Sequence, residues 1–194
     1  MGRDFVDLPF PEYLDELARE TRVPGSGPAA ALTTAAAAAL VAMAARFLRK
    51  EWDEAHTSVI QAETLRRRAV DLAREDAVAL SAFISERDKP AEKRQEARDF
   101  QLGRSLERAA DVPLAIAATA SDVALLAAHV AEHAEHDIRA DAAGAALLAH
   151  GAARAAAHLV AINLAAGSDD ERSRAAARFE RTAADAAASA LAAG

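Results

Sequence analysis

Cysteine is absent from this sequence of 194 residues. Disulfide bonds, thiolate nucleophiles and cysteine-ligated metal sites are therefore excluded, and the lack of cysteine is compatible with a reducing compartment. Residues 1–7 carry charges and form no long apolar stretch, so we expect no signal peptide. These observations predict a cytoplasmic protein.

Aromatic residues are also scarce, at 4% of the chain, although hydrophobic residues make up 52%. Alanine supplies most of the apolar residues, and it is the best helix former because it loses no side-chain entropy and crowds no neighbouring turn. It buries little surface, so an alanine-rich core needs close helix packing and favours further burial at a subunit interface. No alternating pattern typical of a strand is present, so the composition predicts an all-α fold.

Basic clusters are missing too, and the net charge is −7, from 30 acidic and 23 basic residues. A nucleic-acid partner is therefore not expected, because phosphate binding needs a cationic surface. Residues 29–45 lack charges, but these 17 residues are at the short limit for crossing a bilayer and are weakly hydrophobic. We predict a buried helix there and no membrane partner.

Proline, glycine and capping residues divide the chain into six or seven helices within a single domain, residues 1–194. The predicted helices cover residues 11–21, 29–49, 56–85, 90–110, 111–137, 141–166 and 169–192. Asp111 is predicted to cap a new helix with Pro113 in its first turn, Gly167 to end a helix, and Ser168 with Glu171 to form a capping box. The short connections predict a helical bundle.

Six short segments, in order along the chain, carry a resemblance to one family. They are residues 13–18 (YLDELA), 24–32 (PGSGPAAAL), 75–77 (EDA), 112–114 (VPL), 141–149 (DAAGAALLA) and 162–164 (INL). Their order and spacing resemble the cyclodeaminase domain of formiminotransferase-cyclodeaminase and the stand-alone methenyltetrahydrofolate cyclohydrolases. The resemblance covers nearly the whole chain.

The resemblance implies a helical homodimer that acts on a tetrahydrofolate derivative, with no tightly bound cofactor. The related enzymes close 5-formiminotetrahydrofolate with loss of ammonia, or hydrolyse 5,10-methenyltetrahydrofolate to 10-formyltetrahydrofolate. Both reactions pass through a tetrahedral carbon between two nitrogens, where a carboxylate can move protons. Asp141 matches the family's catalytic aspartate and is predicted to be the general acid/base, with its anion stabilised by a helix N-terminus.

Substrate contacts are predicted from the same resemblance. The predicted substrate-binding residues are Pro24, Gly25, Ser26, Gly27, Arg49, Lys50, His136 and Asp137. A glycine-containing loop at a helix N-terminus suits an anion, and the two cations could hold the glutamate tail of a folate. The alternatives are an ordinary interhelical loop and a cation cluster at a helix end. Asp76 is predicted to be solvated or ion-paired.

Cyclohydrolase is the first expectation, because no formiminotransferase segment is present in the 194 residues. The sequence also departs from the family pattern: Ala140 precedes the aspartate, and residues 135–137 replace its Asn-x-Asn. The alternatives are therefore a cyclodeaminase, a divergent enzyme acting on another carbon–nitrogen bond, and a non-catalytic dimeric module.

The histidines offer one further hypothesis. His129, His133 and His136 follow steps of four and three, which puts them on one face if a single helix contains them. Metal binding stays open for this cluster, but a polar helix end is favoured and no metal is assigned. His150 and His158 share another face and are predicted to make hydrogen bonds between helices.

Overall fold

A computed structural model describes residues 4–88, 95–164 and 170–193, with the side chains of residues 95–108 left undescribed. The elements are η1 (Phe5–Asp7), α1 (Phe10–Leu17), α2 (Ser26–Phe47), α3 (Ala55–Arg87), α4 (Gln95–His133), α5 (His136–Asn163) and α6 (Glu171–Ala192). The described residues contain no strand. The prediction of an all-α bundle is therefore confirmed.

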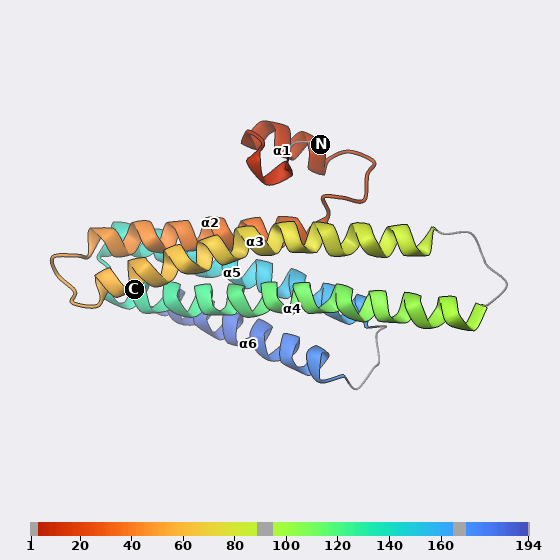
Figure 1. Ribbon diagram of the computed structural model, residues 1–194. Helices are drawn as coiled ribbons and strands as arrows, with labels where there is room; N and C mark the ends of the chain where they lie inside the picture. Colours follow the sequence, from red (N-terminus) through yellow and green to blue (C-terminus); the bar gives the residue numbers. More distant parts are fainter. Residues whose placement is uncertain (1–3, 89–94, 165–169, 194) are drawn as a thin grey trace.

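Helices α2, α3, α4 and α5 lie side by side along one axis, α6 runs obliquely beside them, and α1 stands against the flank of the bundle (Figure 1). The most extensive contacts join α4 with α5, α2 with α3, and α2 with α5. Helices α2 and α5 run in opposite directions, so the start of α2 lies beside the later part of α5. Arg74 of α3 pairs with Asp4 and thereby fixes the N-terminal segment to the bundle.

Alanine fills most of the core, as its abundance predicts. In α2, for example, Ala31, Ala37, Ala38 and Ala42 are fully buried. Small side chains let helix backbones approach closely, and a few larger residues such as Leu72 of α3 complete the packing. Residues 29–45 form a mostly buried part of α2, which confirms the buried helix predicted there.

The predicted helix start at Asp111 is wrong, because α4 continues through Pro113. A proline inside a helix has no N–H for the carbonyl four residues earlier, which here belongs to Ala109. Asn163, at the end of α5, supplies the missing donor: its Nδ2 lies 2.7 Å from the Ala109 carbonyl oxygen. Asp111 lies exposed within α4, and one of its carboxylate oxygens is 3.0 Å from Nη1 of Arg172.

Other helix ends differ from the predictions by a few residues. Helix α6 is capped by Asp170, whose side chain accepts a hydrogen bond of 2.8 Å from the backbone N–H of Arg172, and not by the predicted serine. Ser168 and Gly167, like Pro90, lie outside the described residues. Helix α5 begins at His136, five residues before the predicted start, because only residues 134–135 interrupt the chain.

Three helical segments are long and apolar enough to cross a membrane by length and composition. They are Ser26–Phe47, Ala109–His133 and His136–Asn163. The bundle buries 61% of the apolar window in each of the first two, but only 39% of the window in α5. Helix α5 therefore presents the least covered apolar surface of the three.

Candidate functional site

The loop before α2 packs closely against the middle of α3. Pro24 is buried and follows a cis peptide bond, and Gly27 lies in the first turn of α2. A Cβ atom at position 27 would lie 2.1 Å from Oδ2 of Asp76. Only glycine leaves room for the carboxyl group, so the loop and Asp76 depend on each other.

Asp76 differs from its sequence prediction. Its side chain is buried, with the residue only 8% exposed, and it makes no ion pair or hydrogen bond within the part of the chain that the structure describes. The prediction that Asp76 is solvated or ion-paired is therefore wrong. Burial disfavours the charged carboxylate and raises the pKa of Asp76 to about 6. A group with such a pKa can accept and return a proton near neutrality.

A cavity of about 560 Å³, wide open to solvent, lies farther along α3, between residues 21–23 and the C-terminal end of the helix; neither Asp76 nor Gly27 lines it. Its lining residues are Thr21, Arg22, Val23, Ser81, Ile84, Ser85, Arg87 and Asp88. Ser81 follows Asp76 by five residues, or about 7.5 Å along the helix. The volume is typical of a pocket for a small organic molecule. Arg22 is exposed there and forms no ion pair with a described residue, whereas Arg87 pairs with Asp88 at 2.7 Å.

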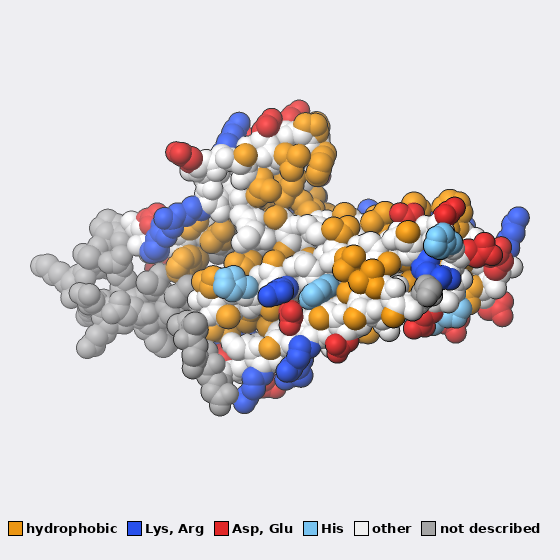
Figure 2. Space-filling model, turned by 180° about the vertical axis from the view of Figure 1, so that it is seen from behind, with side chains coloured by type: hydrophobic (Ala, Val, Ile, Leu, Met, Phe, Trp, Pro, Cys, Tyr) orange, Lys and Arg blue, Asp and Glu red, His pale blue; other side chains and the backbone are white. Residues whose placement is uncertain are grey.

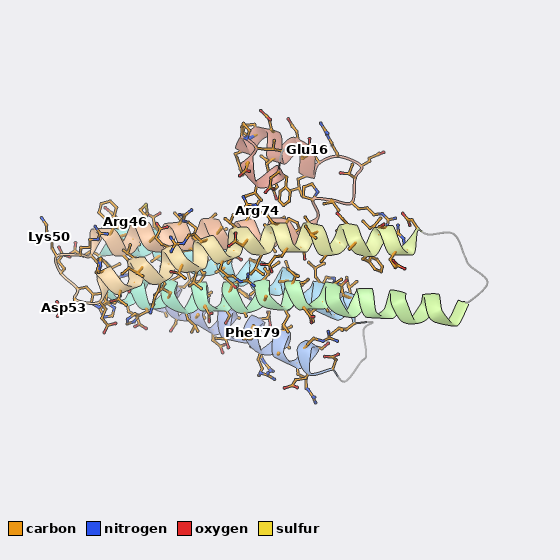
Figure 3. All side chains as sticks on the ribbon, in the orientation of Figure 1. Glu16, Arg46, Lys50, Asp53, Arg74 and Phe179 are labelled. Atoms are coloured by element: carbon orange, nitrogen blue, oxygen red, sulfur yellow. The ribbon has the colours of Figure 1, made fainter. Side chains whose placement is uncertain are left out.

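The other predicted contact residues lie beyond the far end of α2, where the bundle itself ends (Figure 1). Arg49 and Lys50 follow the last residue of α2, and the 22 residues of that helix span about 33 Å. Figure 3 shows Lys50 at that end, remote from the loop before α2. His136 and Asp137 begin α5 at the same end and are exposed. The structure therefore divides the predicted substrate-binding residues into two groups.

Asp141 lies near His136 and Asp137, at the start of α5. It is exposed in the second turn of α5, and its carboxylate makes no hydrogen bond or ion pair with a described residue. One groove between α2 and α5 is lined by Ser26 and by Ala155, so these residues mark the same level of the bundle. Asp141 precedes Ala155 by 14 residues, which is about 21 Å along a helix. One chain alone does not bring Asp141 to the glycine loop.

The predicted histidine face is also altered. Helix α4 ends at His133 and α5 begins at His136, so the three histidines do not lie on one helix, and that prediction is wrong for His136. The residues that come together are His129, Glu132 and His133. His150 lies 3.4 Å from Glu180 of α6, which confirms its predicted interhelical contact. His158 is exposed and makes no hydrogen bond with a described residue, so the same prediction is wrong for His158.

The described residues thus form a helical protein in which a buried carboxyl group faces a glycine-containing loop, with an open cavity farther along α3. The family model described as formiminotransferase-cyclodeaminase matches residues 9–182, and the chain belongs to this family. The resemblance in the six sequence segments is therefore confirmed.

Two relatives can be compared in detail. A methenyltetrahydrofolate cyclohydrolase from Methylorubrum extorquens is 34% identical over 166 residues, which cover 81% of this chain and 79% of that protein. The crystal structure of formiminotetrahydrofolate cyclodeaminase from Thermotoga maritima superimposes with a TM-score of 0.86, covering 98% of this chain and 97% of that one. At 24% identity, this second likeness concerns the fold alone.

Proposed function

We propose that this chain is a methenyltetrahydrofolate cyclohydrolase and that Asp76 is its general acid/base. The observation that carries the proposal is a buried carboxyl group with a pKa of about 6 held against Gly27, five residues along α3 from Ser81, which lines the open cavity. The 34% identity to a cyclohydrolase favours hydrolysis over ammonia release. Asp141 is the rival acid/base, supported by its sequence motif but by no cavity or polar partner described for it.

The reaction needs one group that moves a proton twice. Asp76, as the carboxylate, takes a proton from water while the water oxygen bonds to the methenyl carbon between N5 and N10. The resulting carbon is tetrahedral. Asp76 then returns its proton to N5 as the carbon–N5 bond breaks, and the new hydroxyl group loses its proton to solvent to become the formyl carbonyl on N10. The balance is one water consumed and one proton released.

Binding needs an apolar wall for the ring system and a cation for the glutamate tail. Ile84 and Val23 supply apolar surface in the cavity, and Arg22 supplies a guanidinium group suited to carboxylates. Ser26 is exposed at the start of α2, where backbone N–H groups and the helix dipole favour an anionic group. In this mechanism, side chains of this chain and water carry out every step of the hydrolysis, without a bound cofactor.

We also propose that the functional unit is a homodimer formed through α2 and α5. The exposed fractions of large apolar residues on these helices are 64% for Phe47, 46% for Leu147, 43% for Leu148 and 57% for Ile162. Figure 2 shows hydrophobic side chains spread along the face of the bundle seen from behind. A second copy would cover the apolar surface that the bundle leaves open on α5.

Turnover of two substrates tests the proposed function. Purified wild-type protein is expected to hydrolyse 5,10-methenyltetrahydrofolate faster than the uncatalysed background and to release no ammonia from 5-formiminotetrahydrofolate. Ammonia release would make it a cyclodeaminase. Activity on neither substrate would contradict the proposal and favour a divergent enzyme or a non-catalytic module.

Two matched substitutions test the assignment of the acid/base. Asp76→Asn is expected to lower kcat about 10²- to 10⁴-fold, the usual contribution of a general acid/base. Asp141→Asn, the same change at the rival position, should keep most of the wild-type kcat. The reverse order would transfer the role to Asp141.

A further inference from the structure

A histidine–carboxylate cluster lies at the end of the bundle opposite Asp76. His129, Glu132 and His133 occupy the last turn of α4, at the spacing i, i+3 and i+4 that places side chains on one helix face. Each offers one ligand atom, and these atoms all lie within 4.8 Å of one another. We propose that this cluster binds a divalent transition-metal ion of the zinc type.

In each of the two imidazoles, one ring nitrogen makes a hydrogen bond, and the other keeps a lone pair that can bind a metal. Nδ1 of His133 lies 2.9 Å from the backbone carbonyl oxygen of His129, which can only accept, so Nδ1 carries the hydrogen and Nε2 keeps its lone pair. Nε2 of His129 lies 3.1 Å from a carboxylate oxygen of Glu54. That contact leaves Nδ1 of His129 to face Glu132, whose carboxylate oxygen is 3.7 Å away.

This arrangement is the one that holds metal-binding histidines in proteins. One ring nitrogen binds the ion, and the other donates its hydrogen to a carboxylate or a backbone carbonyl, which fixes the tautomer and the ring orientation. Glu54 and the carbonyl of His129 have these two roles here. Glu54 precedes α3, so a second element of the fold helps to hold the cluster.

Trp52 orients the rings further. Its ring stacks on His133 with a centroid distance of 4.3 Å and an interplanar angle of 10°, and it meets the edge of His129 at 5.0 Å and 73°. These contacts restrict both imidazoles before any ion arrives, which reduces the entropy lost on binding. A polar helix end that only faced solvent would not need these partners.

The donor set indicates the kind of ion. Two imidazole nitrogens and one carboxylate suit Zn²⁺, Cu²⁺ or Ni²⁺, whereas Mg²⁺ and Ca²⁺ prefer oxygen ligands alone. Three protein ligands leave a fourth position for water or another group. The groove next to His129 and Glu132 is lined on its other side by Thr182, Asp185 and Ser189 of α6.

Metal titration of the full chain, stripped with a chelator, tests the site. Calorimetry with Zn²⁺ is expected to give one ion per chain. Cu²⁺ should quench the fluorescence of Trp52, the chain's single tryptophan, because it stacks on a ligand ring. His129→Ala and His133→Ala should each weaken Zn²⁺ binding about tenfold or more, and Glu54→Gln should weaken it by about tenfold through the outer hydrogen bond.

His56→Ala is the matched control, since His56 is another exposed histidine close to Glu54 in sequence and outside the cluster. It should bind Zn²⁺ as the wild type does, and circular dichroism should show that all four variants are folded. No saturable Zn²⁺ binding, unchanged binding in His129→Ala and His133→Ala, or an equal loss in His56→Ala would each overturn the proposal. None of these outcomes depends on folate turnover.

Discussion

At position 27, the fold has room for a hydrogen atom but not for a methyl group. Gly27→Ala would force its Cβ atom into the space of the Asp76 carboxyl group. We expect this substitution to lower the free energy of unfolding by about 1–3 kcal/mol, as overpacking of a core does, and to lower turnover as well. Urea unfolding and initial rates measure the two effects.

Gly144→Ala is the control for that substitution. A Cβ atom at position 144 meets nothing within 4 Å, and Gly144 lies inside α5. Alanine is the better helix former, so the free energy of unfolding should stay equal or rise by up to about 1 kcal/mol. Equal stability and turnover in the two alanine variants would mean that the contact between Gly27 and Asp76 has no consequence.

The pKa of Asp76 also predicts how stability depends on pH. This pKa is about 6 in the folded chain against an ordinary value of 3.8, so the folded state binds more protons than the unfolded state between these values. The contribution of Asp76 to stability is therefore fully present below about pH 3.8 and is lost as the pH rises through about 6.

Asp76→Asn removes this dependence, because asparagine does not titrate. Relative to wild type, the variant should gain up to about 3 kcal/mol of unfolding free energy between pH 4 and pH 7, at 1.36 kcal/mol for each unit of pKa. Denaturant unfolding of both proteins across this range measures the difference. A difference that stays constant with pH would contradict the buried, titrating carboxyl group.

The sequence contained a signal for Asp76. Leu72, Ala73, Ala79 and Leu80 lie three or four residues from it along the helix, so the aspartate lies on the apolar face of its helix. A carboxylate in that position is costly unless it has a partner or a function. Neighbouring charged residues such as Glu75 indicated a solvated helix face instead, and the family motif indicated Asp141 as the catalytic residue.

At the scale of the helices, one hydrogen bond joins the end of α5 to α4 where Pro113 interrupts the bonding within α4. Asn163→Leu would leave the Ala109 carbonyl oxygen without the donor that replaces the missing N–H of Pro113. We expect a cost of about 1–3 kcal/mol in the free energy of unfolding, the usual penalty for a buried unpaired polar group.

A double-mutant cycle tests this coupling. In a Pro113→Ala background, the new N–H can bond to Ala109 within the helix, so Asn163→Leu should cost less than it does in wild type. Urea unfolding of the four proteins gives the four free energies. Equal costs in the two backgrounds would show that Asn163 does not compensate for the proline.

This bond also explains which helix boundaries could be predicted. The predicted ends of α3 are within two residues of the observed ends, because residues close in sequence determine where this helix begins and ends. The break predicted at Asp111 was wrong because the group that lets the helix continue comes from Asn163, 54 positions away from Ala109. No local pattern contains that information.

At the scale of the whole molecule, α5 is the least buried of the three long apolar helical segments, with 39% of its apolar window buried. We expect the wild-type protein to be a dimer by sedimentation equilibrium, and Leu148→Glu to be a monomer because a charge cannot be buried at an apolar interface without a partner. Leu191→Glu, at a residue 59% exposed on α6, should remain dimeric. A monomeric wild type, or one that partitions into lipid vesicles, would contradict the proposed interface.

Composition was sufficient to predict the fold, because alanine favours helices and no strand pattern is present, and the order of the six motifs was sufficient to predict the family. They could not predict the site as a whole. Residues 24–27 and the cations Arg49 and Lys50 were predicted to bind one substrate, but they lie at the two ends of a helix of 22 residues. That separation follows from how the helices pack together, which single motifs do not contain.

The most direct test of the account is the pH dependence of kcat for 5,10-methenyltetrahydrofolate hydrolysis. With Asp76 acting first as a base, kcat should fall below an apparent pKa near 6, and Asp76→Asn should be slow and independent of pH across that range. An Asp76→Asn protein that keeps the wild-type rate and pH profile would contradict the central claim.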